Sequence, residues 1–143
     1  MKKVVTITGG SGGYVLLTGL SQRPDNITAI CTTFDSGGHS GKIRGEFGFI
    51  PPGDLRQCLS ALSSGAMYDG WKTIFMHRFK GDGGTHLDGV SLGNAIMTAL
   101  FEAYGQEEGM EKLNAMLGVK GKVWPVSFDN AELCVEFADG SQM

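Results

Sequence analysis

The feature that most constrains the fold is a short apolar segment followed at once by a glycine-rich loop. Residues 3–8 read KVVTIT, a pattern typical of a buried β-strand, and residues 9–13 then place four glycines in five positions. Apolar residues resume at Tyr14, and the segment to Ser21 has room for two turns of helix. This order of elements directs the unpaired N–H groups of a helix N-terminus towards an anion.

A second β-branched run over residues 27–34 completes a βαβ unit and ends at Asp35. Asp35 follows Gly12 at close to the roughly 20-residue spacing at which a dinucleotide-binding unit places its ribose-binding acid. Val15 stands where the third glycine of that fingerprint would fall, so the match is partial. The residues alone leave open a nucleotide phosphate, a nicotinamide dinucleotide and a tight turn without a ligand.

The rest of the chain predicts an α/β domain, Rossmann-like, with three layers and a mainly parallel sheet. Apolar residues recur at helical spacing after Asp54, after Ser91 and before Gly118, and Gly105 separates the last two helices. The polar, glycine-rich stretch 36–48 predicts a long loop. The remaining predicted elements are a helix at 67–79 and two strands, 122–127 and 132–137, that form an antiparallel pair near the C-terminal end.

Length and composition predict one domain, residues 1–143, that can bury a core, with 41% hydrophobic residues and a net charge of −3. No basic run suggests a nucleic-acid partner, and no apolar run is long enough for a membrane span, so we expect a cytoplasmic protein. The turn Asp139-Gly140 has too few residues after it for a return strand. We therefore expect the N-terminal part of a longer chain, an exposed strand edge at 132–137, and a homodimer in the full-length form.

Candidate ligand contacts gather at strand ends and at the starts of predicted helices. Glycines let the backbone approach a phosphate, serine hydroxyls donate hydrogen bonds, and aspartates offer carboxylates. The predicted ligand-binding residues are Gly9, Gly10, Ser11, Gly12, Asp35, Gly37, Gly38, Ser40, Gly53, Asp54, Ser91, Gly93 and Asn94. No catalytic residue can be assigned, and the sequence predicts no metal-ligating cluster.

The order and spacing of these motifs resemble the CofD/YvcK-like family. That family joins the 2-phospho-L-lactate transferases of deazaflavin coenzyme synthesis to the YvcK-type gluconeogenesis and morphogenesis factors of bacteria. The YvcK-type pattern GGGTG-x-x-VLL-x-GL is echoed by residues 8–20, DDGGSSG-x-LR by residues 35–44, and LPPGD-x-R-x-CL-x-AL by residues 50–62. Shorter similarities at residues 78–84, 89–94 and 119–125 extend the resemblance over the whole chain.

The resemblance implies a nucleotide-binding regulator that takes a UDP-sugar and acts in carbon metabolism and cell shape. The alternative that it implies is a CofD-type 2-phospho-L-lactate transferase, which uses a nucleotide diphosphate donor and a deazaflavin; Mg²⁺ is expected only in that case. Ser36 replaces the second acid of the family's aspartate pair, and Val90 replaces a histidine. Because adjacent carboxylates suit Mg²⁺ beside phosphates, these departures favour binding over catalysis. A nicotinamide-dependent oxidoreductase would rest only on the βαβ unit and the acid at Asp35.

Overall fold

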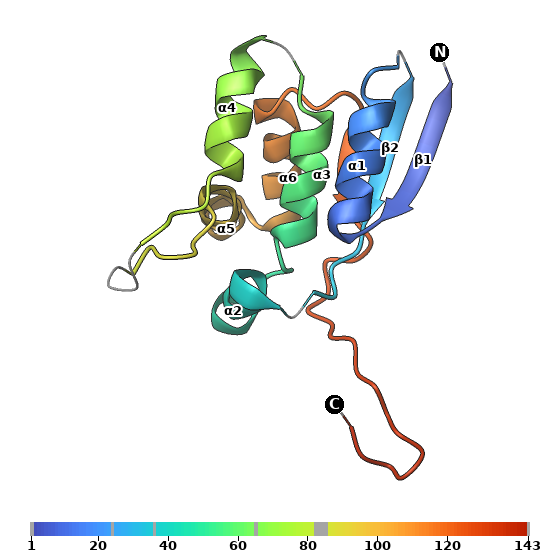
Figure 1. Cartoon of the computed structure of the whole chain (residues 1–143), viewed down its shortest axis with the longest axis vertical. Helices are drawn as coiled ribbons and strands as arrows, with labels where there is room; N and C mark the ends of the chain where they lie inside the picture. The colour runs from blue at the N-terminus through green and yellow to red at the C-terminus, as the bar shows by residue number, and fades with distance from the viewer. Residues whose placement is uncertain (1, 24, 36, 65, 82–85, 143) are drawn as a thin grey trace.

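The described part of the chain is a parallel sheet with helices packed around it (Figure 1). The structure, a computed structural model, describes residues 2–23, 25–35, 37–64, 66–81 and 86–142. In chain order its elements are β1 (Lys3–Thr8), α1 (Gly10–Leu20), β2 (Asn26–Cys31), α2 (Gly38–Phe47), α3 (Gly53–Leu62), α4 (Ala66–Met76), α5 (Leu92–Tyr104), α6 (Gln106–Met116) and β3 (Lys122–Pro125). No helix among these residues is long and apolar enough to cross a membrane.

The sheet has the order β1-β2-β3, and both neighbouring pairs are parallel. Thr8 of β1 is level with Cys31 of β2, and Cys31 is level with Pro125 of β3. The carboxyl ends of the three strands therefore reach the same edge of the sheet, which is the edge where ligands bind in open α/β folds. The α/β class and the parallel sheet are confirmed.

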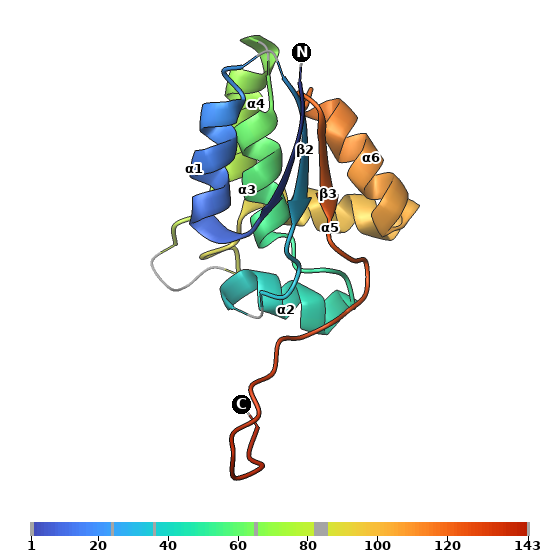
Figure 2. The ribbon, with the colours of Figure 1, turned by 90° about the vertical axis from the view of Figure 1, so that its right-hand side faces the viewer.

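Helices lie on both faces of the sheet (Figure 2). On one side α1 packs against α3, and α4 lies beyond α3; on the other side is α6, which contacts β3 and α5. The fully buried side chains at the centre of the core come from β2, α3, α5, α6 and β3, and include Ile27, Leu59, Met97, Leu113 and Val123. The helices predicted after Asp54 and Ser91 are confirmed at α3 and α5, as are the next helix and the strand β3.

Strand β1 is much more exposed than β2. It pairs with β2 on one side, and Val5 and Ile7 are 67% and 79% exposed on the face away from α1. In the doubly wound strand order 3-2-1-4-5-6 the first strand has a neighbour on both sides. The order seen here corresponds to 3-2-1, and the second edge of β1 has no partner strand among the described residues.

The long loop predicted at 36–48 is wrong, because residues 38–47 form helix α2. Its glycines suggested a loop, and intrinsic propensity does disfavour a helix there. Tertiary contacts outweigh that preference: Ile43 is buried, and Arg44 donates to the Ala131 carbonyl and pairs with Glu132. Gly48, at φ +71°, ends the helix in the left-handed conformation that glycine tolerates best.

The predicted antiparallel pair near the C-terminal end is also wrong for the described residues. β3 covers Lys122–Pro125 and pairs in parallel with β2, whereas residues 132–137 are extended without a partner strand and project from the body (Figure 1). The predicted turn does form, since Gly140 has φ +81° and the Phe137 N–H donates to the Ser141 carbonyl at 2.8 Å. Leu133 is 76% exposed, as expected for a strand-like segment without a neighbour.

Candidate functional site

Three helix N-termini meet at the carboxyl edge of the sheet. The first contact joins the end of β2 to α3: the Thr32 hydroxyl, just after β2, donates to Asp54 Oδ2 at 3.1 Å. A Cβ at position 9 would lie 2.1 Å from Thr32 Oγ1 and 3.1 Å from Asp54 Oδ2, so Gly9 leaves the space that this contact needs. Asp54 lies in the first turn of α3, where the helix dipole stabilises its negative charge.

The glycine loop supplies three backbone donors at the start of α1. The N–H groups of Gly10, Ser11 and Gly12 have no acceptor among the described residues, and no side chain caps this helix. Gly10 has φ +63°, a conformation that favours glycine. A Cβ at position 12 would meet nothing within 4 Å, so the space beside Gly12 is open.

The second contact joins α2 to α3 through Asp35. Asp35 Oδ1 accepts the Gly37 N–H at 2.8 Å, just before α2 begins. A Cβ at position 53 would lie 2.6 Å from Ser40 Oγ and 3.7 Å from Asp35 Oδ2. The structure therefore brings the predicted residues Gly37, Ser40 and Gly53 into one group with Asp35.

Two buried thiols lie beneath this edge, and one of them, Cys31, remains protonated. Cys31 and Cys58 are both buried, and Thr8 Oγ1 lies 3.6 Å from Cys58 Sγ. Hydrogen bonding with the Cys58 thiol, together with burial, raises the pKa of the Cys31 thiol. Because the thiolate is the reactive form, Cys31 is a poor nucleophile at neutral pH.

The predicted residues on α5 lie on a different side of α3. The Arg56 side chain donates from Nε to Asn94 Oδ1 at 2.9 Å, and Asn94 is buried. A Cβ at position 93 would lie 2.7 Å from Arg56 Cδ. Asp54 and Arg56 are two positions apart on one helix, which separates their directions by about 200°. Ser91, Gly93 and Asn94 are thus grouped with Arg56 rather than with the glycine loop.

Sequence reasoning missed two polar residues that organise this region. Thr32 was placed inside the strand predicted at 27–34, whereas β2 ends at Cys31 and frees the Thr32 side chain for Asp54. Arg56 was not singled out, although a cation next to the apolar stripe of a buried helix is a signal that could have found it. Ser36, which replaces a family acid, and residues 82–85 lie outside the described residues.

Asp35 and Asp54 are the carboxylates that this edge offers to a cation. Neither forms an ion pair with a described residue. The described chain holds no group of three or more His, Cys, Asp or Glu side chains arranged for a metal ion. Oxygen donors from a bound phosphate would have to complete the coordination of Mg²⁺ here.

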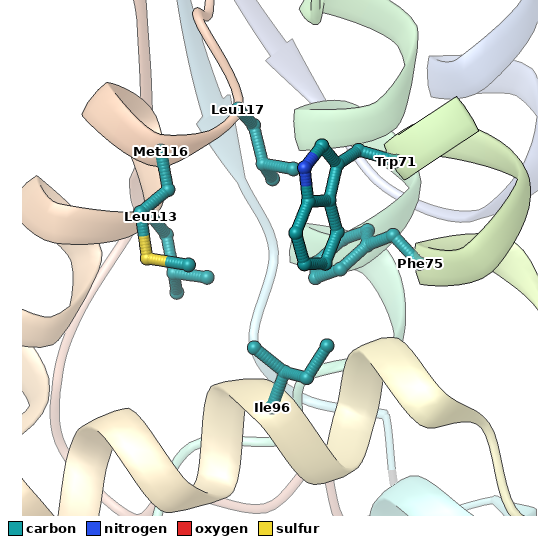
Figure 3. A pocket seen from close by; sticks show the side chains of 6 residues that line it. All are labelled: Trp71, Phe75, Ile96, Leu113, Met116 and Leu117. Carbon is teal, nitrogen blue, oxygen red and sulfur yellow. The ribbon is translucent and has the colours of Figure 1, made fainter. Parts of the chain in front are cut away.

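An apolar pocket of about 180 Å³ lies away from the strand ends, among α4, α5 and α6 (Figure 3). Its lining is Trp71, Phe75, Ile96, Leu113, Met116 and Leu117. None of these side chains carries a charge, so the pocket offers no partner for a phosphate. The polar carboxyl edge of the sheet remains the candidate site.

Comparison with known proteins identifies the family of the chain. The signature of the family described as "2-phospho-L-lactate transferase CofD" matches residues 4–143. The chain is 40% identical over 139 residues to the "Gluconeogenesis factor" of Bacillus subtilis and 40% identical over 141 residues to the "Gluconeogenesis factor" of Halalkalibacterium halodurans. A crystal structure of a Bacillus halodurans protein superposes with a TM-score of 0.87 at 40% identity.

These relatives are much longer than the chain. The matches cover 96% and 98% of this chain, but 43% of the Bacillus subtilis protein and 42% of the Halalkalibacterium halodurans protein. The superposition covers 99% of this chain and 45% of the chain in the crystal structure. The chain therefore spans less than half of the length of these relatives.

Proposed function

The chain belongs to the family described as 2-phospho-L-lactate transferase CofD, and we propose that it binds a nucleotide sugar, a UDP-sugar, as a regulator of carbon metabolism and cell shape. The observation that carries the proposal is the set of three unpaired N–H groups at Gly10, Ser11 and Gly12, with open space around the Cβ positions of Gly10 and Gly12. Such donors at a helix N-terminus suit a diphosphate. The name "Gluconeogenesis factor" of two relatives supports a role in carbon metabolism.

Each group at the carboxyl edge has a part in this proposal. The α1 donors and the Ser11 hydroxyl hold the diphosphate. Asp35 accepts hydrogen bonds from ribose or sugar hydroxyls, and its orientation is held by the Gly37 N–H. Asp54, fixed by Thr32, does the same from α3. Ser40 adds a neutral donor close to Asp35 and Gly53.

The residues of the site are suited to binding a ligand rather than to catalysing a reaction. Beneath the glycine loop the Cys31 thiol has a raised pKa, so it does not supply a thiolate. Val90 stands where the resemblance implies a histidine, which removes a general acid or base. The site thus has donors and acceptors for recognition and lacks an assigned nucleophile.

The alternative function is a 2-phospho-L-lactate transferase that moves a phospholactyl group from a nucleotide diphosphate donor to a deazaflavin. The observation that favours it is the pair of aspartates, Asp35 and Asp54, both free of ion pairs in the described chain and both close to the helix N-termini. With phosphate oxygens they would hold Mg²⁺, which would neutralise charge developing on the phosphate.

Titration calorimetry with UDP-N-acetylglucosamine tests the binding proposal. Gly12→Asp places a carboxylate in front of the α1 donors, and we expect at least about tenfold weaker binding from charge repulsion. Gly19→Asp is the matched control, because position 19 is in the same helix and a Cβ there also meets nothing within 4 Å. Absence of heat with UDP-sugars and other nucleotides would remove the proposal. Product formation with Mg²⁺, abolished by Asp35→Asn, would establish the transferase instead.

We also propose that the protein acts in the cytoplasm as a homodimer. The exposed Val5 and Ile7 of β1 and the extended segment 132–137 support association, because exposed strands tend to pair. Light scattering on the 143-residue chain tests this proposal: a mass of two chains is expected, and a monodisperse monomer would contradict it. Val5→Lys with Ile7→Lys should shift a dimer formed through β1 to monomer.

A further inference from the structure

Arg56 is a buried cation without an anionic partner. Its side chain is 7% exposed, and no described carboxylate forms an ion pair with it. Its Nε donates to Asn94 Oδ1 at 2.9 Å, and another guanidinium nitrogen contacts Met76 Sδ at 3.0 Å. A thioether is a weak acceptor, and a buried cation without an opposite charge is costly. A purely structural arginine would be expected to have a better set of partners.

A second guanidinium, that of Arg78, lies beside the start of α5, because Arg78 and Ser91 form an antiparallel bridge. Burial, followed by the positive charge of Arg78, lowers the pKa of Arg56. Arg78 is exposed, donates to the Gly89 carbonyl, and forms no ion pair with a described carboxylate. Two like charges are therefore held near each other without compensation from the described chain.

The N-terminus of α5 adds unpaired donors at the same place. The Ser91 hydroxyl is fully buried and has no hydrogen-bond partner, although Ser91 is the residue that caps the helix. A serine at this position normally accepts from an N–H of the first turn. Here the N–H groups of Gly93 and Asn94 also lack an acceptor among the described residues. The packing of Gly93 against Arg56 Cδ brings these donors next to the Arg56 side chain.

We propose that Arg56, Arg78, Ser91 and the first turn of α5 form an oxyanion site for a phosphate group, separate from the glycine loop. A phosphate accepts hydrogen bonds from both guanidinium groups, from the Ser91 hydroxyl and from the free N–H groups, and it neutralises the two cations. The site lies on the side of α3 that faces α5, whereas Asp54 faces the glycine loop on the other side. It does not depend on the nature of the ligand at the glycine loop.

The phosphate can come from a second phosphorylated small molecule or from a distant part of the ligand at the glycine loop. Both sources present the same chemistry to Arg56 and Ser91. They differ in one measurable respect, because only a shared ligand makes UDP-sugar affinity depend on the α5 site.

Methionine-methyl NMR of the 143-residue protein reports on the site directly, since Met76 contacts Arg56. Inorganic phosphate is titrated at constant ionic strength, with Met76→Leu used for assignment and buried Met110 as an internal control. We expect the Met76 signal to shift and saturate while the Met110 signal stays in place. Ser91→Ala should raise the phosphate concentration at half-shift about tenfold. This variant should keep its fold, because the hydroxyl has no partner to lose.

Arginine variants provide a matched pair. Arg78→Gln should weaken the Met76 response about tenfold through loss of a charged donor, and Arg23→Gln, another exposed arginine, should leave it unchanged. A Met76 signal that does not move at tens of millimolar phosphate would overturn the site. So would a response that is equal in the wild type, Ser91→Ala and Arg78→Gln.

Calorimetry with UDP-N-acetylglucosamine on the same variants then identifies the source. If Ser91→Ala binds UDP-N-acetylglucosamine as tightly as the wild type does, the oxyanion site belongs to a second phosphorylated molecule. If Ser91→Ala binds it more weakly, the oxyanion site is a subsite for one shared ligand. Both results are consistent with the oxyanion site. If no UDP-sugar binds at all, the function proposed above fails while the Met76 response to phosphate still stands.

Discussion

The N-termini of α1 and α5 both present unpaired N–H groups, and they are built in different ways. The N-terminus of α1 is formed by backbone: it has four glycines and no side-chain cap, and the space beside position 12 is open. The N-terminus of α5 is formed by packed side chains: Arg56 and Asn94 are buried together, and Ser91 is buried as well. The first end is open and depends on glycine conformations, whereas the second is packed and depends on long-range contacts.

This difference determines how each end should respond to substitution. A packed end loses stability when an atom is added or a partner is removed. At an open end the same kind of substitution should leave the free energy of unfolding nearly unchanged and should weaken ligand binding instead. The substitutions below test that contrast, beginning with the largest expected effect.

Gly93→Ala should be the most damaging single change at either helix end. The added Cβ would lie 2.3 Å from the Phe75 carbonyl oxygen and 2.7 Å from Arg56 Cδ, and the backbone oxygen cannot move away without shifting the end of α4. We expect a loss of about 3 kcal/mol in the free energy of unfolding, measured by urea denaturation. Gly19→Ala, in open space on α1, is the control and should not destabilise. Near-equal stability of the two variants would contradict the packed description of α5.

Asn94→Ala should have the next largest effect. It removes the acceptor for Arg56 Nε and leaves a charged donor unsatisfied in a buried position. We expect a loss of about 2 kcal/mol, because hydrogen bonds to charged groups contribute more than neutral ones. Asn130→Ala, at an exposed position, provides the comparison and should change the urea midpoint very little. A similar midpoint for both variants would mean that Arg56 finds another acceptor.

Sequence patterns predicted the elements whose apolar residues repeat regularly. The stripe Leu55, Cys58, Leu59 and Leu62 predicted α3, and all four side chains are buried. Helix α2 could not be predicted in this way, because contacts from Ala131 and Glu132, far along the chain, hold Arg44 in place. Residues 132–137 have the alternation of a strand, but a strand also needs a neighbour, which the described chain does not provide.

In the candidate site, too, residues at loops and helix starts could be predicted from local sequence, whereas residues grouped by long-range packing could not. Gly9, Asp35, Ser40, Gly53 and Asp54 were proposed from the local chemistry of loops and helix starts, and the structure brings them together. Their role in ligand binding stays a prediction. The grouping of Arg56 with Ser91 and Asn94 depends on how α3 packs near α5, and no spacing in the sequence encodes that contact.

Thr32→Val tests the α1 side with a smaller expected change. The substitution keeps the shape of the side chain and removes the hydroxyl that donates to Asp54 Oδ2 at 3.1 Å. We expect a loss of about 1 kcal/mol, less than for Asn94→Ala, because the contact is only partly buried and water can replace it. Thr28→Val, within β2, the strand that ends just before Thr32, is the control and should not destabilise. A loss larger than that of Asn94→Ala would reverse the contrast between the two ends.

Gly12→Ala should give the smallest change in stability, and with the opposite sign. Because a Cβ at position 12 meets nothing within 4 Å, alanine there should raise the free energy of unfolding by about 0.5 kcal/mol through its higher helix propensity. The same methyl group should weaken UDP-sugar binding, since it stands where a phosphate would approach the α1 donors. Urea denaturation and calorimetry on one variant measure both effects. A residue that costs stability in the free protein and is required for the ligand is a binding residue; an unchanged affinity would make Gly12 a dispensable part of the turn.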